Sequence, residues 1–383
     1  MPENGRSQMY CMLNKKIKEM FFKMRKGCLL ASLLFLSAWT VGAKNKIEYV
    51  SAEKLTITGK LMETPASPFH RVDTVMYSDI PAVVKRYLTH SAGLAVCFRT
   101  NSPEIWARWE VSPHKGYANL TPIANKGLDL YIRRDGKWQA VGTGSPKDVY
   151  TENVIAENMD SEEKECLLYL PLYDETRRLE IGIAEGAYIY PAADPFLKRI
   201  VVYGSSVLQG ASASRPGMAY AARLSRETGL NFINVGISGN GKMHAPVVEM
   251  FTRQPADAFI LDCIPNPSAD EITERAPKMI RALRASHPEV PIIVIQTLIR
   301  EKSYFDQAVE KRVKSQNQAI DAVMQQLSQE QIPHLYYIRE DNFLGTDHEG
   351  ATDGVHPNDL GFDRMLNKTR PQILSILKQY GIY

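Results

Sequence analysis

The carboxy-terminal half of the chain alternates short apolar segments with longer segments of helical pattern, which restricts the fold more than any other feature. The apolar segments have the length of strands and cover 200–203, 231–235, 258–263, 291–298 and 334–338. The helical segments cover 219–228, 245–252, 269–286, 306–328 and 360–380. Strands that alternate with helices form a parallel sheet with helices on both faces. We therefore predict an α/β fold for this half.

The first of these strands runs directly into small residues. Ile200 to Tyr203 lead into Gly204, Ser205 and Ser206, so a hydroxyl group is expected at the carboxyl edge of the sheet. Ligands of open α/β sheets bind at that edge, and small residues let the backbone approach a ligand closely. A Gly-Ser-Ser run alone usually marks an ordinary turn, so its meaning depends on the residues at the ends of the other strands.

Near the carboxyl end of the chain, Asp353 and His356 stand three residues apart. A carboxylate at this spacing can accept a hydrogen bond from Nδ1 of the imidazole, which leaves Nε2 free to take a proton. With a serine from another strand end, the pair would complete a nucleophile, a base and an orienting acid. By itself, Asp-x-x-His is most often a surface turn or a helix cap.

Two further strand ends carry candidate hydrogen-bond donors. Gly239 lies in the glycine-rich segment after 231–235, and Asn266 follows 258–263. The backbone N–H groups of Ser206 and Gly239 and the side-chain amide of Asn266 would together make an oxyanion hole. Each residue alone is a turn former, but the carboxyl ends of parallel strands meet at one edge of the sheet.

The order Gly-x-Ser, Gly, Asn, Asp-x-x-His resembles the SGNH (GDSL-type) hydrolases. The resemblance implies a flavodoxin-like three-layer fold, a catalytic triad of Ser206, His356 and Asp353, and an oxyanion hole of Ser206, Gly239 and Asn266. Two blocks depart from the family pattern: Ser205 replaces its Asp, and the third block reads Ile-Pro-Asn-Pro rather than Gly-x-Asn-Asp. The α/β-hydrolase fold is a poor rival, because Leu208 occupies the last position of Gly-x-Ser-x-Gly.

Residues 44–194 are predicted to form a β-sandwich or jelly-roll-like domain. Strand-like runs alternate there with turn clusters, as is typical of such folds, and cover 93–98, 105–111, 128–132 and 179–183. Gly127-Leu128-Asp129-Leu130-Tyr131 resembles the Gly-x-Asp-Leu-Tyr motif of the β-rich domain that precedes some bacterial SGNH hydrolases. The proline-flanked segment 191–195 is predicted to connect this domain to a hydrolase domain at 195–383.

Residues 1–43 are predicted to be an export signal. Lys23, Arg25 and Lys26 precede an apolar run at 28–41, and a small-residue cleavage pattern ends at Ala43. The run is shorter than the roughly 20 residues of a membrane span. We therefore expect a periplasmic or extracellular protein with no membrane span after signal removal, and Met20 or Met24 is an alternative translation start.

Charge and cysteine content argue against a nucleic-acid-binding protein, a disulfide-rich protein and a metalloprotein. Residues 1–43 contribute +5 to the formal net charge of +3, which leaves −2 for the remainder. A nearly neutral body argues against a nucleic-acid partner. Cys97, Cys166 and Cys263 are too widely spread for a disulfide framework or a metal cluster and are expected to be small buried hydrophobes. No metal or organic cofactor is expected, because the histidines of the first half also lack metal spacing (His70, His90 and His114).

Other polar and aromatic residues carry weaker signals. The tryptophans Trp106, Trp109 and Trp138 are expected in the core rather than in a sugar-stacking platform. Four residues in loops near the predicted sheet edge are candidates for substrate contact, although salt bridges or helix caps are the more frequent roles of such residues: Arg215, His244, Arg300 and Glu349.

The sequence thus predicts an exported serine esterase that removes small acyl groups, with acetyl groups on carbohydrates as the expected substrate. A lipase, thioesterase or lysophospholipase using the same triad is an alternative. A glycan-binding protein with a vestigial triad is another, and Ser205 is the alternative nucleophile. Oligomeric state is not readable from the sequence.

Overall fold

The computed structural model describes residues 46–63 and 67–383, together with residues 16, 18 and 20. The export signal predicted at 1–43 lies almost entirely outside these residues. Residues 47–383 form one compact unit, and the domain boundary at 194/195 stays a prediction. Within the described ranges, no helix is both long enough and apolar enough to cross a membrane.

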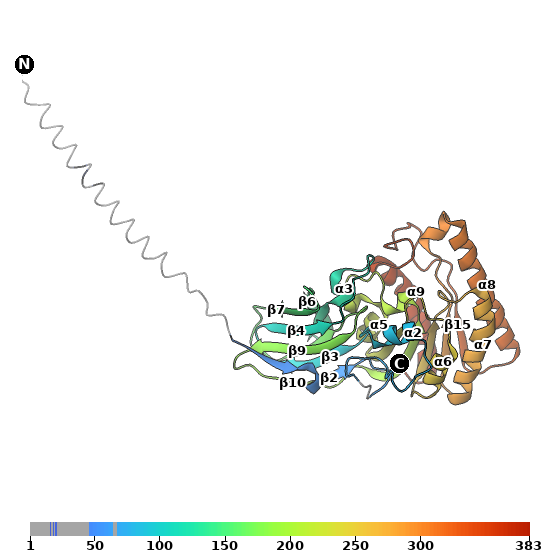
Figure 1. Ribbon diagram of the computed structural model, residues 1–383, viewed down its shortest axis with the longest axis horizontal. Coiled ribbons are helices and arrows are strands. Elements are labelled where there is room, and N and C mark those ends of the chain that lie inside the picture. The colour runs from blue at the N-terminus through green and yellow to red at the C-terminus, as the bar shows by residue number, and fades with distance from the viewer. Residues whose placement is uncertain (1–15, 17, 19, 21–45, 64–66) are drawn as a thin grey trace, which may run out of the picture. The chain divides into compact units, whose positions relative to one another are not determined.

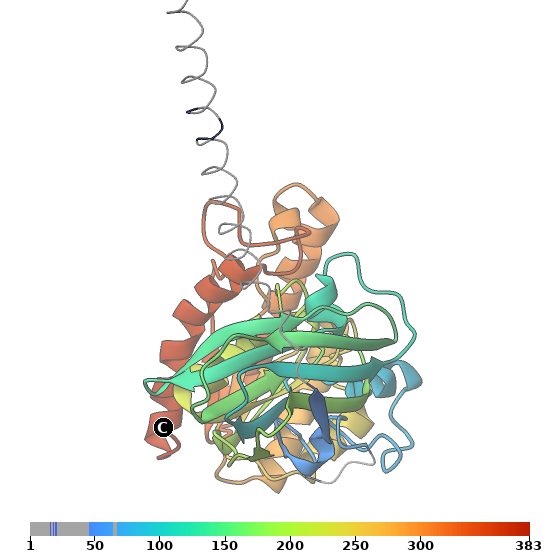
Figure 2. The ribbon, with the colours of Figure 1, turned by 90° about the vertical axis from the view of Figure 1, so that its left-hand side faces the viewer.

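The first half of the described chain folds into two antiparallel sheets (Figures 1 and 2). Strands of one sheet follow the order β1 (Ile47–Ser51), β9 (Thr176–Ala184), β4 (Ile105–Val111) and β7 (Tyr150–Ala156). Strands of the other follow the order β10 (Ile189–Pro191), β3 (Ala95–Thr100), β8 (Lys164–Tyr169), β5 (Leu128–Arg134) and β6 (Lys137–Gly144), with β2 (Thr56–Thr58) paired to β3. Two helices lie in the connections, α2 (Ala82–Thr89) and α3 (Pro122–Lys126).

One hydrophobic core fills the space between these two sheets. Trp109 and Ile181 enter it from the first sheet, and Phe98, Leu130 and Leu168 enter it from the second. Along β4 the burial alternates with every residue, because successive side chains of a strand point to opposite faces. The pattern explains why the sequence located β4 with its bounds.

The tryptophans do not form a shared platform. Trp109 is fully buried, and its Nε1 donates to the backbone oxygen of Lys126 at 2.9 Å. Trp106 lies on the opposite face of β4, and Trp138 of β6 lies near the guanidinium group of Arg133. The core interpretation is therefore confirmed for Trp109. The cysteines are free and buried, as expected (Cys97, Cys166 and Cys263).

The second half of the chain contains a parallel sheet, which confirms the predicted α/β class. Its strands follow the order β12 (Leu230–Gly236), β11 (Leu197–Gly204), β13 (Ala258–Asp262), β14 (Ile292–Ile295) and β15 (Leu335–Ile338). From β11 the chain first adds β12 on one side and then β13 on the other. This reversal of direction opens a crevice at the carboxyl end of β11, where open α/β sheets place their ligands.

The helices of this half fall into two packed groups: α5 (Tyr220–Thr228) contacts β12 and α9 (Asp359–Gln379), while α7 (Ala269–Ser286) contacts both α6 (Ala245–Thr252) and α8 (Gln307–Gln329). Figure 1 shows α7 and α8 side by side at one end of this half. A capping box formed by Ser268 and Glu271 satisfies the first amides of α7 and fixes where it begins.

The two halves share packing and polar contacts. Val84 and Leu172 of the first half lie in one hydrophobic core with Val202 and Ile233 of the parallel sheet. Arg71 is fully buried and donates from Nη1 to the backbone oxygens of two residues at the end of β12, at 2.9 and 3.0 Å. The halves therefore share one core, in addition to the core between the two antiparallel sheets.

Two residues of the Gly-x-Asp-Leu-Tyr motif form a second polar contact between the two halves. The carboxylate of Asp129 accepts from Nη1 of Arg215 and from the amide of Gly217, each at 2.8 Å. Tyr131 accepts a further hydrogen bond from Arg215. A side chain on Gly217 would approach the ring of Tyr131 to 2.5 Å, so glycine is required there. The motif thus fastens the first half to the segment that follows α4 (Ser206–Gln209).

Candidate active site

The carboxyl end of β11 places Ser206 at the crevice. Strand β11 ends at Gly204, where a Cβ atom would lie 2.8 Å from the backbone oxygen of Asp262. Ser205 caps the short helix α4, because its side-chain oxygen accepts from the amide of Val207 at 3.2 Å. Ser206 is the first residue of that helix and is largely buried. The tight turn therefore presents one serine hydroxyl to the crevice and uses the other internally.

The structure brings Ser206, His356 and Asp353 into one hydrogen-bonded chain. Oγ of Ser206 lies 2.9 Å from Nε2 of His356, and Nδ1 of His356 lies 2.8 Å from Oδ2 of Asp353. A turn at Gly354, with φ of +78°, folds the Asp-x-x-His segment back on itself. The other carboxylate oxygen of Asp353 accepts from the amides of Val355 and His356, at 3.0 and 2.8 Å.

The surroundings of Asp353 keep it ionised. Partial burial raises the pKa of its carboxyl group, but hydrogen bonds from the His356 side chain and from two backbone amides outweigh this effect and hold the pKa below its usual range. An ionised Asp353 favours the imidazole tautomer with the proton on Nδ1. Nε2 of His356 is then the acceptor that faces the Ser206 hydroxyl.

The three predicted oxyanion donors lie beside the same cavity. This cavity has a volume of about 430 Å³ and is lined by Ser206, His356, Gly239 and Asn266 among others. As the first residue of α4, Ser206 has no intrahelical acceptor for its amide. Gly239 has φ of +67°, a conformation that favours glycine. Oδ1 of Asn266 accepts from Gly241 at 3.0 Å, which leaves its NH₂ group as the free end of the amide.

One side chain that the sequence interpretation missed comes from the antiparallel half. Nδ2 of Asn119, in the segment before α3, donates to Oδ2 of Asp353 at 3.1 Å and lies 3.2 Å from Nδ1 of His356. The hydroxyl group of Ser212 donates to the backbone oxygen of Asn119 at 3.0 Å and holds this segment in place. Asn119 follows no strand of the parallel sheet, so no sequence pattern pointed to it.

The candidate substrate-contacting residues have different surroundings. Arg300 lines the cavity, together with Lys242 and Arg312, which the sequence interpretation did not single out. Arg215 forms the expected salt bridge, with Asp129. Glu349 lies in an exposed loop, where its backbone oxygen accepts from Asn358.

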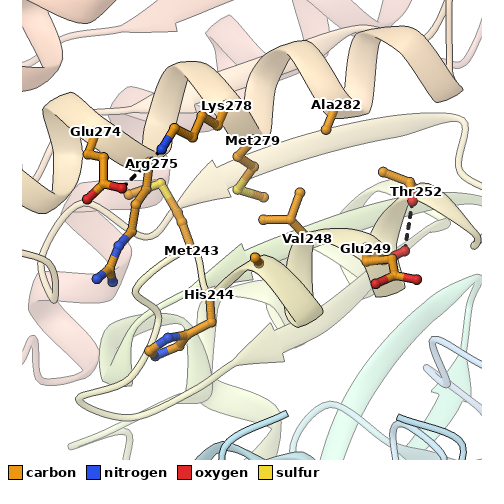
Figure 3. Close-up of a pocket in the computed structure, with 11 residues that line it drawn as sticks. Met243, His244, Val248, Glu249, Thr252, Glu274, Arg275, Lys278, Met279 and Ala282 are labelled. Carbon is orange, nitrogen blue, oxygen red and sulfur yellow. Dashed lines mark hydrogen bonds and ion pairs between the residues drawn. The ribbon is translucent and has the colours of Figure 1, made fainter. Parts of the chain in front are cut away.

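His244 lies in a second cavity, of about 540 Å³, between α6 and α7 (Figure 3). Figure 3 shows Val248 and Met279 on opposite walls of this cavity, and Glu274 paired with Lys278 at its rim. The residues that line it include no serine or cysteine. It therefore offers no serine or cysteine nucleophile, and the chemistry is expected at the cavity that contains Ser206.

Comparisons with known proteins identify the family of the chain. Residues 197–374 match the GDSL-like lipase/acylhydrolase family, and residues 47–189 match the N-terminus of SGNH-hydrolase-type esterases. A solved structure from Bacteroides ovatus, described as a GDSL-like lipase, is 58% identical with a TM-score of 0.86, and the match covers 87% of this chain and 98% of that one. The chain belongs to the GDSL-like lipase/acylhydrolase family. No curated protein sequence matches it.

More distant structures share the fold across both halves. A salicylyl-acyltransferase from a tetracycline biosynthetic pathway is 19% identical with a TM-score of 0.70, covering 86% of this chain and 97% of that one. A family two carbohydrate esterase from Cellvibrio japonicus is 12% identical with a TM-score of 0.58, covering 87% of this chain and 99% of that one. The order of an antiparallel half followed by a parallel α/β half is therefore common to these proteins.

Proposed function

We propose that the protein is a serine esterase that removes acetyl groups from carbohydrates by acyl transfer. The observation that carries the proposal is the hydrogen-bonded chain from Ser206 through His356 to Asp353, at 2.9 and 2.8 Å, beside a cavity that also holds the amides of Gly239 and Asn266. A nucleophile, a base, an orienting acid and oxyanion donors are the complete set that ester hydrolysis by acyl transfer requires.

In the proposed first step, Oγ of Ser206 attacks the ester carbonyl carbon while its proton passes to Nε2 of His356. The carbonyl electrons move to the oxygen, where the amides of Ser206 and Gly239 and the side chain of Asn266 stabilise the negative charge. When the carbonyl re-forms, the bond to the alcohol breaks, and the alcohol leaves with the proton from His356. Water then attacks the acyl group on Ser206 by the same route and releases acetate.

Two observations support a small acyl group on a sugar. The cavity beside Ser206 is lined mostly by polar and charged side chains, and its apolar side chains are few (Val207, Pro265, Leu298 and Val355). A long hydrocarbon chain would need a more extended apolar lining. The fold is also that of a structure described as a family two carbohydrate esterase. A lipase or thioesterase acting through the same triad is the second candidate, supported by the matching family description.

We also propose an architecture for each half of the chain and export of the protein from the cytoplasm. The shared core between the two antiparallel sheets supports a jelly-roll-like β-sandwich for residues 44–194, and the two helix groups support a flavodoxin-like three-layer arrangement for 195–383. The basic flank and apolar run within residues 1–43 support export to the periplasm or the extracellular space.

The test is hydrolysis of p-nitrophenyl acetate by the protein and by two serine variants. Ser206→Ala is expected to lower kcat by at least about 10³, because the nucleophile is lost. Ser205→Ala is the matched control: it removes the cap of α4, costs about 1 kcal/mol of stability and leaves the nucleophile in place. If Ser205→Ala abolished activity and Ser206→Ala did not, the nucleophile would be misassigned.

Substrate class is tested separately. Two measurements distinguish a carbohydrate acetylesterase from a lipase or thioesterase. They are the preferred acyl chain length on p-nitrophenyl esters and the release of acetate from acetylated xylan. Activity that rises with acyl chains of eight or more carbons, with no acetate released from the polysaccharide, would favour the lipase. If the unmodified protein cleaves no ester and the Ser206→Ala variant still binds glycans, a glycan-binding function replaces both enzymatic functions.

A further inference from the structure

Positive charge gathers at the cavity that contains Ser206. Lys242, Arg300 and Arg312 line it, and the lining includes no aspartate or glutamate. Lys242 has a distant partner, since its Nζ lies 3.7 Å from Glu271, which also pairs with Arg275. Among the residues that the structure describes, neither Arg300 nor Arg312 forms an ion pair with a carboxylate. Two guanidinium groups beside the reacting atoms therefore lack a counter-charge.

Both arginines are held in place by the loop that carries Asn266. Nη2 of Arg300 donates to the backbone oxygen of Pro265, and Nη2 of Arg312 donates to the backbone oxygen of Asn266, each at 2.9 Å. Successive carbonyls of one loop therefore fix the two groups beside the oxyanion donor. A guanidinium group has five N–H donors in a planar fork, so most donors of each arginine remain for a ligand.

The electrostatic environment of Arg300 indicates the sign of the charge on that ligand. Burial lowers the pKa of Arg300, and the positive charge of Arg312 lowers it further. The two cations thus destabilise each other when the cavity holds only water. A carboxylate or a sulfate group bound between them would remove this repulsion and form charge-assisted hydrogen bonds with both forks.

We propose that Arg300 and Arg312 bind a negatively charged group on the alcohol portion of the substrate, so that the ester is carried by an acidic sugar. This inference rests on the proposed acetylesterase function: an acetyl group has no charge, so the anion must belong to the alcohol. Lys242, in the loop between β12 and α6, adds positive charge to the same cavity.

The first experiment measures binding by isothermal titration calorimetry with oligosaccharides that carry no acyl ester. Trigalacturonate supplies carboxylates, a sulfated carrageenan oligosaccharide supplies sulfates, and xylotriose is neutral. Binding of at least one anionic oligosaccharide is expected to exceed that of xylotriose by about 10-fold or more at low salt, and to weaken as ionic strength rises. Whichever anion binds identifies the acidic group. Equal binding of all three would overturn the proposal.

The second experiment compares variants on acetylated forms of trigalacturonate and xylotriose. Arg312→Gln removes an exposed side chain of α8 and is expected to lower the ratio of kcat/KM between the acidic and the neutral ester by about 10-fold. Lys311→Gln is the matched control, because Lys311 is its exposed neighbour on the same helix and does not line the cavity. Its ratio is expected to stay unchanged.

These outcomes separate the two proposals. If both esters are cleaved and Arg312→Gln leaves the ratio unchanged, the anion site is wrong and the esterase stands. If neither ester is cleaved but trigalacturonate binding still depends on Arg312, the anion site stands and the esterase is wrong. Arg312→Lys distinguishes the effect of the charge from that of the planar guanidinium group. Lysine retains the charge without the planar fork, so the ratio of kcat/KM between the acidic and the neutral ester is expected to lie between those of the unmodified protein and Arg312→Gln.

Discussion

Asp262 ends β13 with a carboxyl group that is almost fully buried. Burial raises the pKa of this group to about 7, although a hydrogen bond from the hydroxyl of Tyr220, at 2.7 Å, opposes the shift. In the unfolded chain an aspartate has a pKa of about 3.9. Between these two values the folded protein holds a proton that the unfolded chain has released.

We therefore expect the free energy of unfolding to decrease as pH rises from about 4 to about 7, by up to about 1.4 kcal/mol per pH unit from this group. Asp262→Asn cannot ionise and is expected to flatten the dependence. Urea unfolding of both proteins at pH 5 and pH 8 measures the difference. Identical pH dependence in the two proteins would show that Asp262 titrates normally.

Asn266 is expected to act on the transition state alone. Loss of one oxyanion donor typically lowers kcat by about 10²–10³. Asn266→Ala should therefore reduce kcat on p-nitrophenyl acetate by this factor with little change in KM, because the substrate carries no full charge on its oxygen before attack. Asn367→Ala, on α9 and away from the cavity, is the control. A loss below about threefold would remove Asn266 from the oxyanion hole.

The sequence located the residues that follow strands of the parallel sheet. Ser206, Gly239 and Asn266 were predictable because the carboxyl ends of parallel strands converge. Asn119 and Arg312 were not. Asn119 reaches Asp353 from a connection in the other half, and Arg312 lies near the start of a charged helix, where a single arginine has no distinguishing pattern.

The connection between β4 and α3 is the element that links the first half to the triad. Its Asn119 donates to Asp353, and we expect Asn119→Ala to lower kcat by about 10-fold while KM changes little. Loss of a donor to a carboxylate raises the pKa of that carboxyl group. The acidic limb of the pH–rate profile should therefore move to higher pH.

The matched control for this element is Thr121→Val. Thr121 caps α3 and donates to the backbone oxygen of Ser214 at 2.6 Å, but it does not contact the triad. The variant is expected to cost about 1 kcal/mol of stability and to leave the pH profile in place. Equal effects of the two variants would mean that Asn119 only stabilises the connection.

Elements of the parallel half were predicted closely, and those of the antiparallel half less so. The bounds of α6 and α7 agree with the expected helices, and the long amphipathic segment and capping box of α7 explain the agreement for that helix. Strands β6 and β7 were not predicted. Their residues are largely exposed or half-buried, so they lack the apolar alternation that reveals a strand.

Across residues 47–383, the shared core and the buried Arg71 predict cooperative unfolding. Calorimetry should show one thermal transition for both halves. Arg71→Met removes the side-chain donor to two carbonyls at the end of β12 and one of the two donors to the backbone oxygen of Tyr87, and is expected to destabilise the whole unit by about 1–3 kcal/mol for each carbonyl left unpaired. Arg178→Met, at an exposed pair with Glu180, should change stability by less than about 1 kcal/mol. Two resolved transitions, with only one shifted by Arg71→Met, would contradict this expectation.

The contacts of Arg71 also determine when its surroundings can pack during translation. It donates to the backbone oxygen of Gly236, which lies 165 positions later in the chain. At about 5–20 residues per second, a ribosome needs about 8–30 s to add that stretch. During this interval Nη1 of Arg71 has no access to its two acceptors at the end of β12, because Asn234 and Gly236 have not yet been synthesised, and only the backbone oxygen of Tyr87 is available. The segment around Arg71 therefore completes its packing only after β12 has emerged, and the first half is not a finished unit when it leaves the ribosome.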